Sequence, residues 1–340
     1  MSVFRRIDRE KIQFDFIVHN LENDAYREEI EGLGGRIFIL DRLNFKNPLK
    51  YKRDLDNILE KHKEFSIVHC HFRGTEAIIL KEAKKYGLMT ISHNHGTQNS
   101  SKFNSLIRRI FKKDVLKYSD IKLACSDQAG TDFYGRGSYK KINNGIDTEK
   151  YKFDEDIRRK IRRDLSLSDK YVLINVGSLS DIKNQAFLIR LMPDLLKKNP
   201  DTSLLLVGDG PIKNELENLC KDLKVKDQVI FLGNSDRVNE LLMAADIFLF
   251  PSKREGLGIS AIEAQASGLV SLLSTNVPRE AGISEGARFI DLDRDKWMDE
   301  ILYNKGSIRK NVIEEIRKNG YDIETSVSEL SRIYLNMINE

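Results

Sequence analysis

Short apolar segments alternate with longer amphipathic segments along the whole chain of 340 residues. The apolar segments predict strands at 12–18, 36–40, 66–70, 88–92, 121–125, 171–176, 203–207, 228–232, 246–250 and 269–273. Helical patterns separate these strands, which is typical of parallel sheets covered by helices on both faces. Two sets of five strands therefore predict an α/β protein with two doubly wound, Rossmann-like domains.

A polar turn at 143–147 (NNGID) interrupts this alternation and precedes a charged helix predicted at 154–164. No Pro-rich or Gly/Ser-rich linker is present, so we expect two closely hinged domains, 1–145 and 146–321. A helix at 322–340 is expected to pack back on the first domain. Ligands bind beyond the carboxyl ends of the strands in such sheets, which predicts a cleft between the two domains.

The composition excludes several protein classes. With 40% hydrophobic and 32% charged residues, the chain is globular rather than disordered. Cys70, Cys125 and Cys220 are odd in number, far apart and mostly within apolar runs, which indicates reduced core residues and a cytosolic protein. The sequence has neither an apolar run of about 18 residues nor an apolar leader, so no membrane span is expected.

Basic residues are concentrated in the first half. Residues 1–150 contain 28 Lys and Arg against 21 Asp and Glu, whereas the remainder contains 28 against 31. A predicted basic helix at 103–118 has its apolar residues at helical spacing: Phe103, Leu106, Ile107, Ile110, Phe111 and Leu116. This pattern favours a core helix with a solvated face, and peripheral contact with the inner membrane surface stays open. Without a recognition motif, a nucleic-acid partner is not expected.

The segment EGLGISAIEA contains two glutamates around an expected helix start near Gly258. Glu255 follows the predicted strand at 246–250, and Glu263 lies about five residues into the helix with its side chain leaning back toward the helix N-terminus. The pair could bracket a phosphate there and bind sugar and ribose hydroxyls. Spacing alone leaves open a second interpretation, a dipole-favoured helix glutamate and an unrelated surface residue.

Two further strand–helix joints are glycine-rich. Gly177 and Ser178 lead into a helix expected near Lys183, and Gly208 with Gly210 forms a tight turn before another helix. Glycine allows close backbone approach, and a helix N-terminus attracts anions, so the first joint is a candidate diphosphate site with Lys183 as a point charge. Such joints are also common without a ligand.

All six histidines precede residue 96. Two H-x-H pairs, VHCH with His69 and His71 and SHNH with His93 and His95, lie at the carboxyl ends of predicted strands. Alternation in a strand points residues i and i+2 to one face without any ligand, and no carboxylate or cysteine pattern accompanies them, so no metal site is expected. The other two histidines, His19 and His62, are expected to be satisfied buried residues.

Several ordered motifs resemble the retaining glycosyltransferases of family 4, which have the GT-B fold. They are E-x(7)-E at Glu255 and Glu263, VGSLSDIKNQ, LLLVGDGP, FLGNSDRVNELLMAADIFLFPS, ASGLV and NNGID. The resemblance covers most of the chain. It is nearest to enzymes of capsule, exopolysaccharide and O-antigen assembly.

This resemblance implies a donor site in the second domain for a nucleotide sugar, most often linked to UDP. Lys183 would contact the diphosphate, Glu255 the donor sugar and Glu263 the ribose hydroxyls. The residues implied to border the donor through their backbone or loop position are Gly177, Ser178, Gly208, Gly256, Leu257 and Gly258.

A histidine at the end of the strand in LMTISHNH is implied to face the donor sugar across the cleft, and His95 matches it best. The implied catalytic residues are therefore His95, Lys183 and Glu255. His71 and His93 are expected to be structural or on the acceptor side.

The chain departs from the family pattern in two places. Ser178 stands where the family commonly has an arginine that stabilises the leaving diphosphate, so Lys183, or Arg254 or Arg279, is expected to supply that charge. The chain also opens on VFRRIDR, which resembles the end of the family's first helix. We therefore expect an upstream segment with the family's initial strand and glycine loop.

The implied activity is transfer of a hexose to a glycan or polyprenol-linked saccharide acceptor in surface polysaccharide biosynthesis, with retention at the anomeric carbon. No metal, cofactor or protein nucleophile is expected. Two alternatives stay open at this point: a non-catalytic GT-B subunit that binds a nucleotide sugar or a partner transferase, and a sugar-nucleotide epimerase or hydrolase.

Overall fold

The computed structural model describes residues 1–19, 26–44, 46–71, 75–96 and 105–339. The chain forms two compact units. Unit 1 contains residues 1–145 and 323–340, and unit 2 contains residues 146–322. The boundary between Gly145 and Ile146 falls within the polar turn NNGID.

The strands of unit 1 form two parallel sheets. They are β1 (Phe16–Val18), β2 (Ile37–Ile39), β3 (Ile67–Cys70), β4 (Met89–Asn94), β5 (Ile121–Ala124) and β6 (Lys140–Lys141). β1 pairs with β2, and the other four follow the order β3-β4-β5-β6. Within the described ranges, no strand pairs with both β1 and β3.

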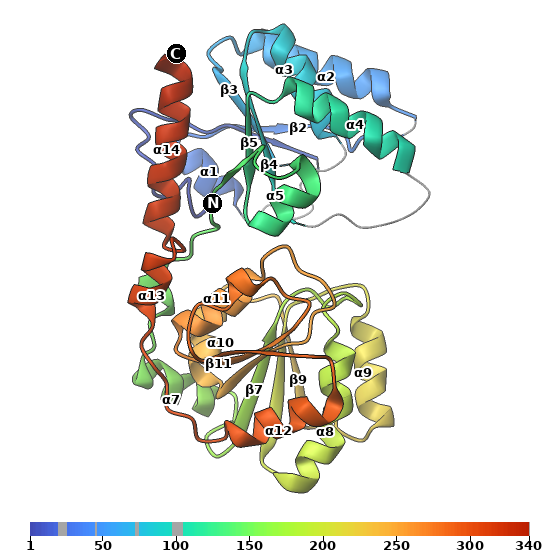
Figure 1. Ribbon diagram of the computed structural model, residues 1–340, viewed down its shortest axis with the longest axis vertical. Coiled ribbons are helices and arrows are strands. Elements are labelled where there is room, and N and C mark those ends of the chain that lie inside the picture. The colour runs from blue at the N-terminus through green and yellow to red at the C-terminus, as the bar shows by residue number, and fades with distance from the viewer. Residues whose placement is uncertain (20–25, 45, 72–74, 97–104, 340) are drawn as a thin grey trace. The chain divides into compact units, whose positions relative to one another are not determined.

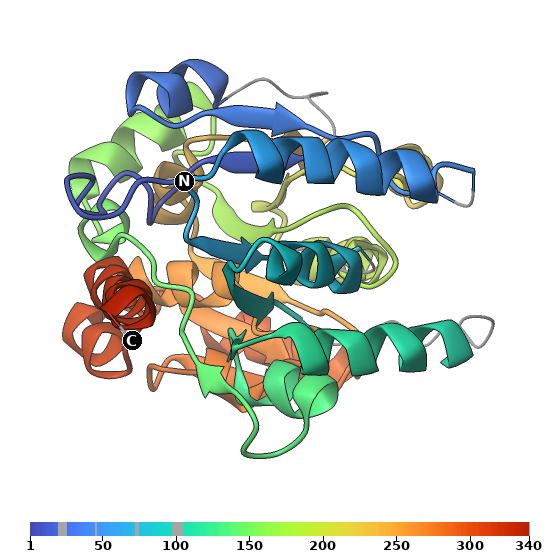
Figure 2. The same cartoon turned by 90° about the horizontal axis from the view of Figure 1, so that it is seen from above.

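Helices cover both faces of these sheets. They are α1 (Arg27–Gly32), α2 (Pro48–Lys61), α3 (Glu76–Lys85), α4 (Ser105–Tyr118), α5 (Asp127–Tyr134) and α14 (Ile323–Asn339). Figure 1 shows α14 on one face, where Leu330 and Ile333 pack against Ile91 and Leu123 in one apolar cluster. On the other face α2, α3 and α4 lie side by side (Figure 2). The C-terminal helix thus belongs to the core of unit 1.

The basic helix predicted at 103–118 corresponds to α4, Ser105–Tyr118. Phe103 lies outside the described residues, as do the side chains of residues 105–110. Of the predicted apolar stripe, Phe111 and Leu116 pack against the cluster that contains the buried Val115. These contacts support the interpretation of α4 as a core helix. Its Lys113 and Lys117 are exposed.

Unit 2 is built on one parallel sheet. Its strands are β7 (Tyr171–Val176), β8 (Thr202–Val207), β9 (Val229–Gly233), β10 (Ile247–Phe250), β11 (Val270–Ser274) and β12 (Ala287–Ile290). The order is β12-β11-β10-β7-β8-β9, so the chain builds outward from β7 and then crosses to β10. β7 and β10 therefore flank the topological switch point, where doubly wound sheets bind ligands.

Helices also cover both faces of this sheet. They are α6 (Thr148–Tyr151), α7 (Glu155–Asp164), α8 (Gln185–Lys198), α9 (Lys213–Asp222), α10 (Val238–Ala244), α11 (Ile259–Ala266), α12 (Arg294–Tyr303) and α13 (Ile313–Lys318), with a short 3-10 helix at Arg279–Ala281. Figure 1 shows α8 and α9 on one side and α10 and α11 on the other. Unit 2 has an apolar cluster on each face of its sheet, and alternate residues of β7 belong to one or the other. Leu173 packs with α8 and α9, whereas Val172 and Ile174 pack with α10 and α11.

The ten predicted strands are all present, but the prediction of two sets of five is wrong. Each unit has a sixth strand among its described residues, β6 in unit 1 and β12 in unit 2. β6 consists of two exposed lysines, and β12 is a short edge strand that contains Arg288. Edge strands commonly contain charged residues instead of a continuous apolar run, so the apolar pattern did not reveal them.

The three cysteines are free and buried, as expected. Among the helices that the structure describes, none combines the length and apolar character required to cross a bilayer.

Glycines let the loops after β7 and β8 pack backbone against backbone. Gly208 has a φ of +131°, and a Cβ atom placed there would lie 2.2 Å from the Gly177 carbonyl oxygen. A Cβ at Gly210 would lie 2.2 Å from the Leu179 carbonyl oxygen. The Leu179 N–H donates to the Asp209 carbonyl at 3.0 Å, which joins the two loops directly. Only glycine fits at these two positions without backbone movement.

The close contact at Gly208 predicts that a side chain at this position destabilises unit 2. Gly208→Ala adds a methyl group against a backbone oxygen and should lower the free energy of unfolding of unit 2 by about 2–4 kcal/mol. Gly306→Ala is the matched control, because Gly306 also has a positive φ, +82°, but a Cβ there meets nothing within 4 Å. Gly306→Ala should lower the free energy of unfolding by only about 1 kcal/mol. Thermal unfolding of both variants measures the difference, and equal losses would contradict the packing described.

Candidate functional site

An ion pair links the two loops that flank the switch point of unit 2. Lys183, in the loop after β7, donates from Nζ to Glu255 Oε1, in the loop after β10, at 2.6 Å. The Lys183 side chain is 23% exposed and that of Glu255 is 9% exposed. Nζ also lies 5.2 Å from the centroid of the Phe250 ring, within cation–π range. Water is therefore largely excluded from the carboxylate but can still reach the ammonium.

Backbone contacts hold the same two loops together. The Lys253 N–H donates to the Ile182 carbonyl at 2.8 Å, and Asn184 Nδ2 donates to the Pro251 carbonyl at 3.1 Å. If a Cβ were added at Gly177, its nearest neighbours would be Lys183 side-chain carbons, 3.7 Å away. The aliphatic part of Lys183 thus lies across a glycine, so its position is set by the loops as well as by Glu255.

Helix α11 begins directly after the loop that carries Glu255. Gly258 is its N-cap and adopts a left-handed conformation with a φ of +93°, and a Cβ there would lie 2.9 Å from the Phe250 ring. Glycine has no side-chain acceptor, so Gly258 cannot cap the first amide groups of α11. Leu257 packs its side chain into the interior at 4% exposure. The helix N-terminus and Lys183 together provide the local positive charge.

Glu263 is the fifth residue of α11, as the sequence predicted. Its Oε1 accepts a hydrogen bond of 2.7 Å from the Tyr151 hydroxyl. Burial raises the pKa of the Glu263 carboxyl, and the Tyr151 hydrogen bond opposes this effect. Tyr151 could not be predicted from the sequence, because it lies on α6, 112 positions earlier in the chain, and no local motif marks it.

The other predicted donor-site residues in unit 2 lie on the same loops or near them. Ser178 is exposed, and its carbonyl accepts from Gln185 Nε2 at 3.1 Å. Arg254 is exposed beside Glu255, and the Arg279 guanidinium stacks 4.2 Å from the Phe289 ring centroid. The prediction that an arginine replaces the charge missing at Ser178 stays a prediction.

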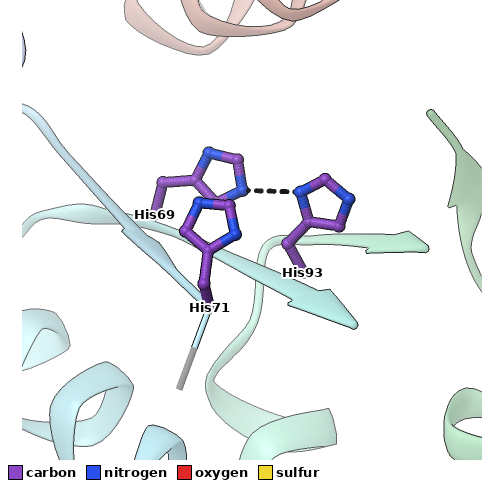
Figure 3. A group of neighbouring side chains, drawn as sticks. All are labelled: His69, His71 and His93. Atoms are coloured by element: carbon purple, nitrogen blue, oxygen red, sulfur yellow. Dashed lines mark hydrogen bonds between the residues drawn. The ribbon is translucent and has the colours of Figure 1, made fainter. Parts of the chain in front are cut away.

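Four histidines of unit 1 form a second group, the histidine cluster, defined as His69, His71, His93 and His95. His69 Nε2 lies 3.1 Å from His93 Nδ1, and His71 Nδ1 lies 2.7 Å from His95 Nε2. The rings of His69 and His71 stack with centroids 4.2 Å apart, and those of His93 and His95 are tilted with centroids 4.1 Å apart. Figure 3 shows three of these rings gathered at the ends of neighbouring strands. The H-x-H pairs are thus joined in space.

Packing of the rings against one another sets the protonation of this cluster, and it desolvates the His71 ring nitrogens although part of that side chain is exposed. Desolvation, reinforced by repulsion from neighbouring histidines, lowers the pKa of His71 to about 4 and those of His69 and His93 below the usual value of 6.5. These three imidazoles are therefore neutral at pH 7. His95 is exposed, and the prediction that it faces the donor sugar stays a prediction.

The remaining two histidines have hydrogen-bond partners but are only partly buried. His19 Nε2 lies 2.8 Å from the Tyr51 hydroxyl oxygen, and His62 Nδ1 lies 3.1 Å from Glu64 Oε1. Their interactions are structural, as expected, but the expectation of full burial is wrong for both. Each lies near the surface of unit 1, where its ring pairs with a polar side chain.

Comparisons with known proteins agree with this architecture. The family model described as Glycosyltransferase Family 4 matches residues 2–150, and the model described as Glycosyl transferases group 1 matches residues 157–284. The glycosyltransferase-family protein EpsF of Bacillus subtilis (strain 168) is 30% identical over 354 aligned residues, which cover 98% of this chain and 91% of EpsF.

Two further proteins are similar over most of their length. The UDP-Gal:alpha-D-GlcNAc-diphosphoundecaprenol alpha-1,3-galactosyltransferase of Escherichia coli is 24% identical over 303 residues, covering 82% of this chain and 78% of that enzyme. The crystal structure of Anabaena Alr3699/HepE in complex with UDP and glucose superposes with a TM-score of 0.83 at 16% identity, covering 98% of this chain and 94% of that one. The chain is thus a glycosyltransferase with the GT-B fold, and it belongs to glycosyltransferase family 4, as its ordered motifs indicated.

Proposed function

We propose that the enzyme transfers a hexose from a UDP sugar to a hydroxyl group of a glycan or polyprenol-linked saccharide, with retention at the anomeric carbon, in surface polysaccharide biosynthesis. The observation that carries this proposal is the Lys183–Glu255 pair at the switch point of unit 2. It combines a cation suited to a diphosphate with a carboxylate suited to sugar hydroxyls, next to the uncapped N-terminus of α11.

Binding of the donor would break the ion pair between Lys183 and Glu255, and each residue would then contact a different part of the ligand. Lys183 turns to the diphosphate, which carries more negative charge after it leaves the sugar than before. Glu255 then accepts hydrogen bonds from the sugar hydroxyls. Because Lys183 interacts more strongly with the departing diphosphate than with the bound donor, its main effect is on the transition state.

The chemical step needs no protein nucleophile. The bond between the anomeric carbon and the diphosphate oxygen breaks, and the acceptor oxygen forms the new bond on the same face of the sugar. The acceptor proton passes to the leaving phosphate oxygen. The protein contributes by positioning the two substrates and by stabilising the developing charge.

The nucleoside is bound beside this site. Glu263, oriented by the Tyr151 hydroxyl, accepts hydrogen bonds from the ribose hydroxyls. His95 is the residue of unit 1 that the family resemblance assigns to the donor sugar. Gly177, Gly208 and the amides of residues 256–258 border the diphosphate and sugar.

Two relatives support the choice of donor and acceptor. Anabaena HepE was crystallised with UDP and glucose, and the Escherichia coli enzyme is named for UDP-Gal and a diphosphoundecaprenol-linked GlcNAc. A polyprenol-linked acceptor would bring the enzyme to the cytoplasmic face of the inner membrane. The exposed Lys113 and Lys117 of α4 support peripheral contact with anionic lipids there.

Acceptor-dependent turnover tests the proposal. Purified enzyme is incubated with a panel of UDP and GDP sugars, with and without a polyprenol-diphosphate-linked saccharide, and nucleotide release and product are followed. The proposal predicts UDP release that requires the acceptor, and a product whose anomeric configuration, determined by NMR, matches the donor. Release of UDP without an acceptor would instead indicate a hydrolase. Binding of a nucleotide sugar without turnover would indicate a non-catalytic subunit. A product with inverted configuration at the anomeric carbon would contradict retention.

Two substitutions should separate the roles of the site residues. Lys183→Ala should lower kcat about 100- to 1,000-fold with little change in donor KM, because Lys183 acts on the departing diphosphate. Glu263→Ala should raise the donor KM about tenfold with a small effect on kcat, because the ribose does not change during the reaction.

Lys197→Ala is the matched control for the lysine substitution. Lys197 lies on α8 near its end, is 77% exposed and pairs with Asp194. Its removal should leave both kinetic constants unchanged. Wild-type kinetics in Lys183→Ala and Glu263→Ala would contradict this assignment of the site.

A further inference from the structure

We propose that His69, His71 and His93 form a binding site for a divalent transition-metal ion such as Zn²⁺ at the carboxyl edge of the β3–β6 sheet. One ring nitrogen from each of the three side chains lies within 4.8 Å of the other two. Figure 3 shows the ring of His71 stacked on that of His69, and the ring of His93 facing His69 from the neighbouring strand. The site lies within unit 1, and the proposal does not rest on the proposed sugar transfer.

The sheet register brings the three side chains together. β3 and β4 are parallel, with Cys70 opposite Ser92, so His71 comes level with His93 just beyond the paired residues. His69 and His71 are two positions apart and therefore share a face of the sheet. Strand geometry thus fixes the grouping, and no rearrangement of the backbone is needed to form it.

The distance between His69 and His93 is close to that between two ligands of a tetrahedral zinc site. Zinc binds imidazole nitrogen at about 2.0–2.1 Å, so two ligands in a tetrahedral site lie about 3.3 Å apart. His69 Nε2 and His93 Nδ1 are 3.1 Å apart and now share one proton, which a metal ion would replace. The His71 nitrogen would have to approach by at most about 1.5 Å, which rotation of this exposed side chain allows.

The outer hydrogen bonds of His69 and His71 match those of histidines that bind metals. His69 Nδ1 lies 2.6 Å from the Tyr334 hydroxyl on α14, which leaves Nε2 directed toward the cluster. His71 Nδ1 lies 2.7 Å from His95 Nε2, which leaves its own Nε2 available. A partner on the second ring nitrogen fixes the orientation and raises the basicity of a metal-binding imidazole.

The chemistry of the three ring nitrogens defines the class of metal ion. Imidazole ligands suit Zn²⁺, Cu²⁺, Ni²⁺ and Co²⁺.

The proposal concerns binding and does not make the metal a requirement for transfer. Three histidines leave the fourth position of a tetrahedral site open for water. Zn²⁺ there would carry positive charge to an edge of the sheet where the neutral histidines now carry none. No carboxylate or cysteine pattern accompanies these histidines in the sequence, but three imidazoles can hold Zn²⁺ without them.

Metal titration of the full chain, purified without a polyhistidine tag, tests the site. Zn²⁺ binding is measured by calorimetry, and Co²⁺ is used as a spectroscopic probe because its visible absorption distinguishes tetrahedral from octahedral coordination. We expect one Zn²⁺ per chain with a Kd of about 1 μM or tighter, corresponding to about 8 kcal/mol, and a tetrahedral Co²⁺ spectrum.

Three variants locate the binding. His71→Ala should weaken Zn²⁺ binding more than about 100-fold, and Tyr334→Phe, which removes the outer partner of His69, about tenfold. His62→Ala removes a histidine outside the cluster and should change nothing. Circular dichroism checks that each variant is folded, and His71 is exposed, so its replacement leaves the core intact. An octahedral Co²⁺ spectrum, or equal Zn²⁺ affinity in His71→Ala and the wild type, would overturn the proposal.

Discussion

The ion pair between Lys183 and Glu255 depends on how the sheet of unit 2 is wound. The strand order reverses between β7 and β10, so the loops that follow these strands diverge from neighbouring strands and leave room at the edge of the sheet. Lys183 reaches across that space to Glu255, and the glycines at 177, 208 and 258 let the loops and α11 pack closely around it. The same features that hold the loops together therefore place a cation, a carboxylate and a helix N-terminus in one small region.

The sequence predicted the parts of this fold that depend on local pattern. Apolar alternation located ten strands, and the start of α11 at Ile259 follows from the glycine at its N-cap. It did not predict β6 and β12, because edge strands need no continuous apolar run. Spacing placed Glu263 on α11, but its hydrogen bond to Tyr151 depends on the tertiary packing of α6 against α11, which no local pattern encodes.

The histidine cluster is a clearer example of contacts that local sequence pattern does not predict. The two H-x-H pairs could be recognised in the sequence, yet each pair alone has a sufficient explanation in strand alternation. Their significance appears only when the parallel pairing of β3 and β4 brings His69 within 3.1 Å of His93, and when α14, more than 200 residues later, supplies Tyr334. Each unit thus has a polar group at the carboxyl edge of a parallel sheet. Unit 1 has the histidine cluster, and unit 2 has the ion pair between Lys183 and Glu255.

The central claim is that Lys183 binds the diphosphate once it has left the donor sugar, and calorimetric titration with UDP and UMP tests it most directly. UMP lacks the β-phosphate, so the ratio of the two affinities isolates the diphosphate contact from contacts to the base and ribose. The wild-type enzyme should bind UDP at least about tenfold more tightly than UMP, a difference of about 1.4 kcal/mol. In Lys183→Ala most of this preference should be lost while UMP affinity is unchanged. An undiminished preference for UDP in that variant would contradict the account.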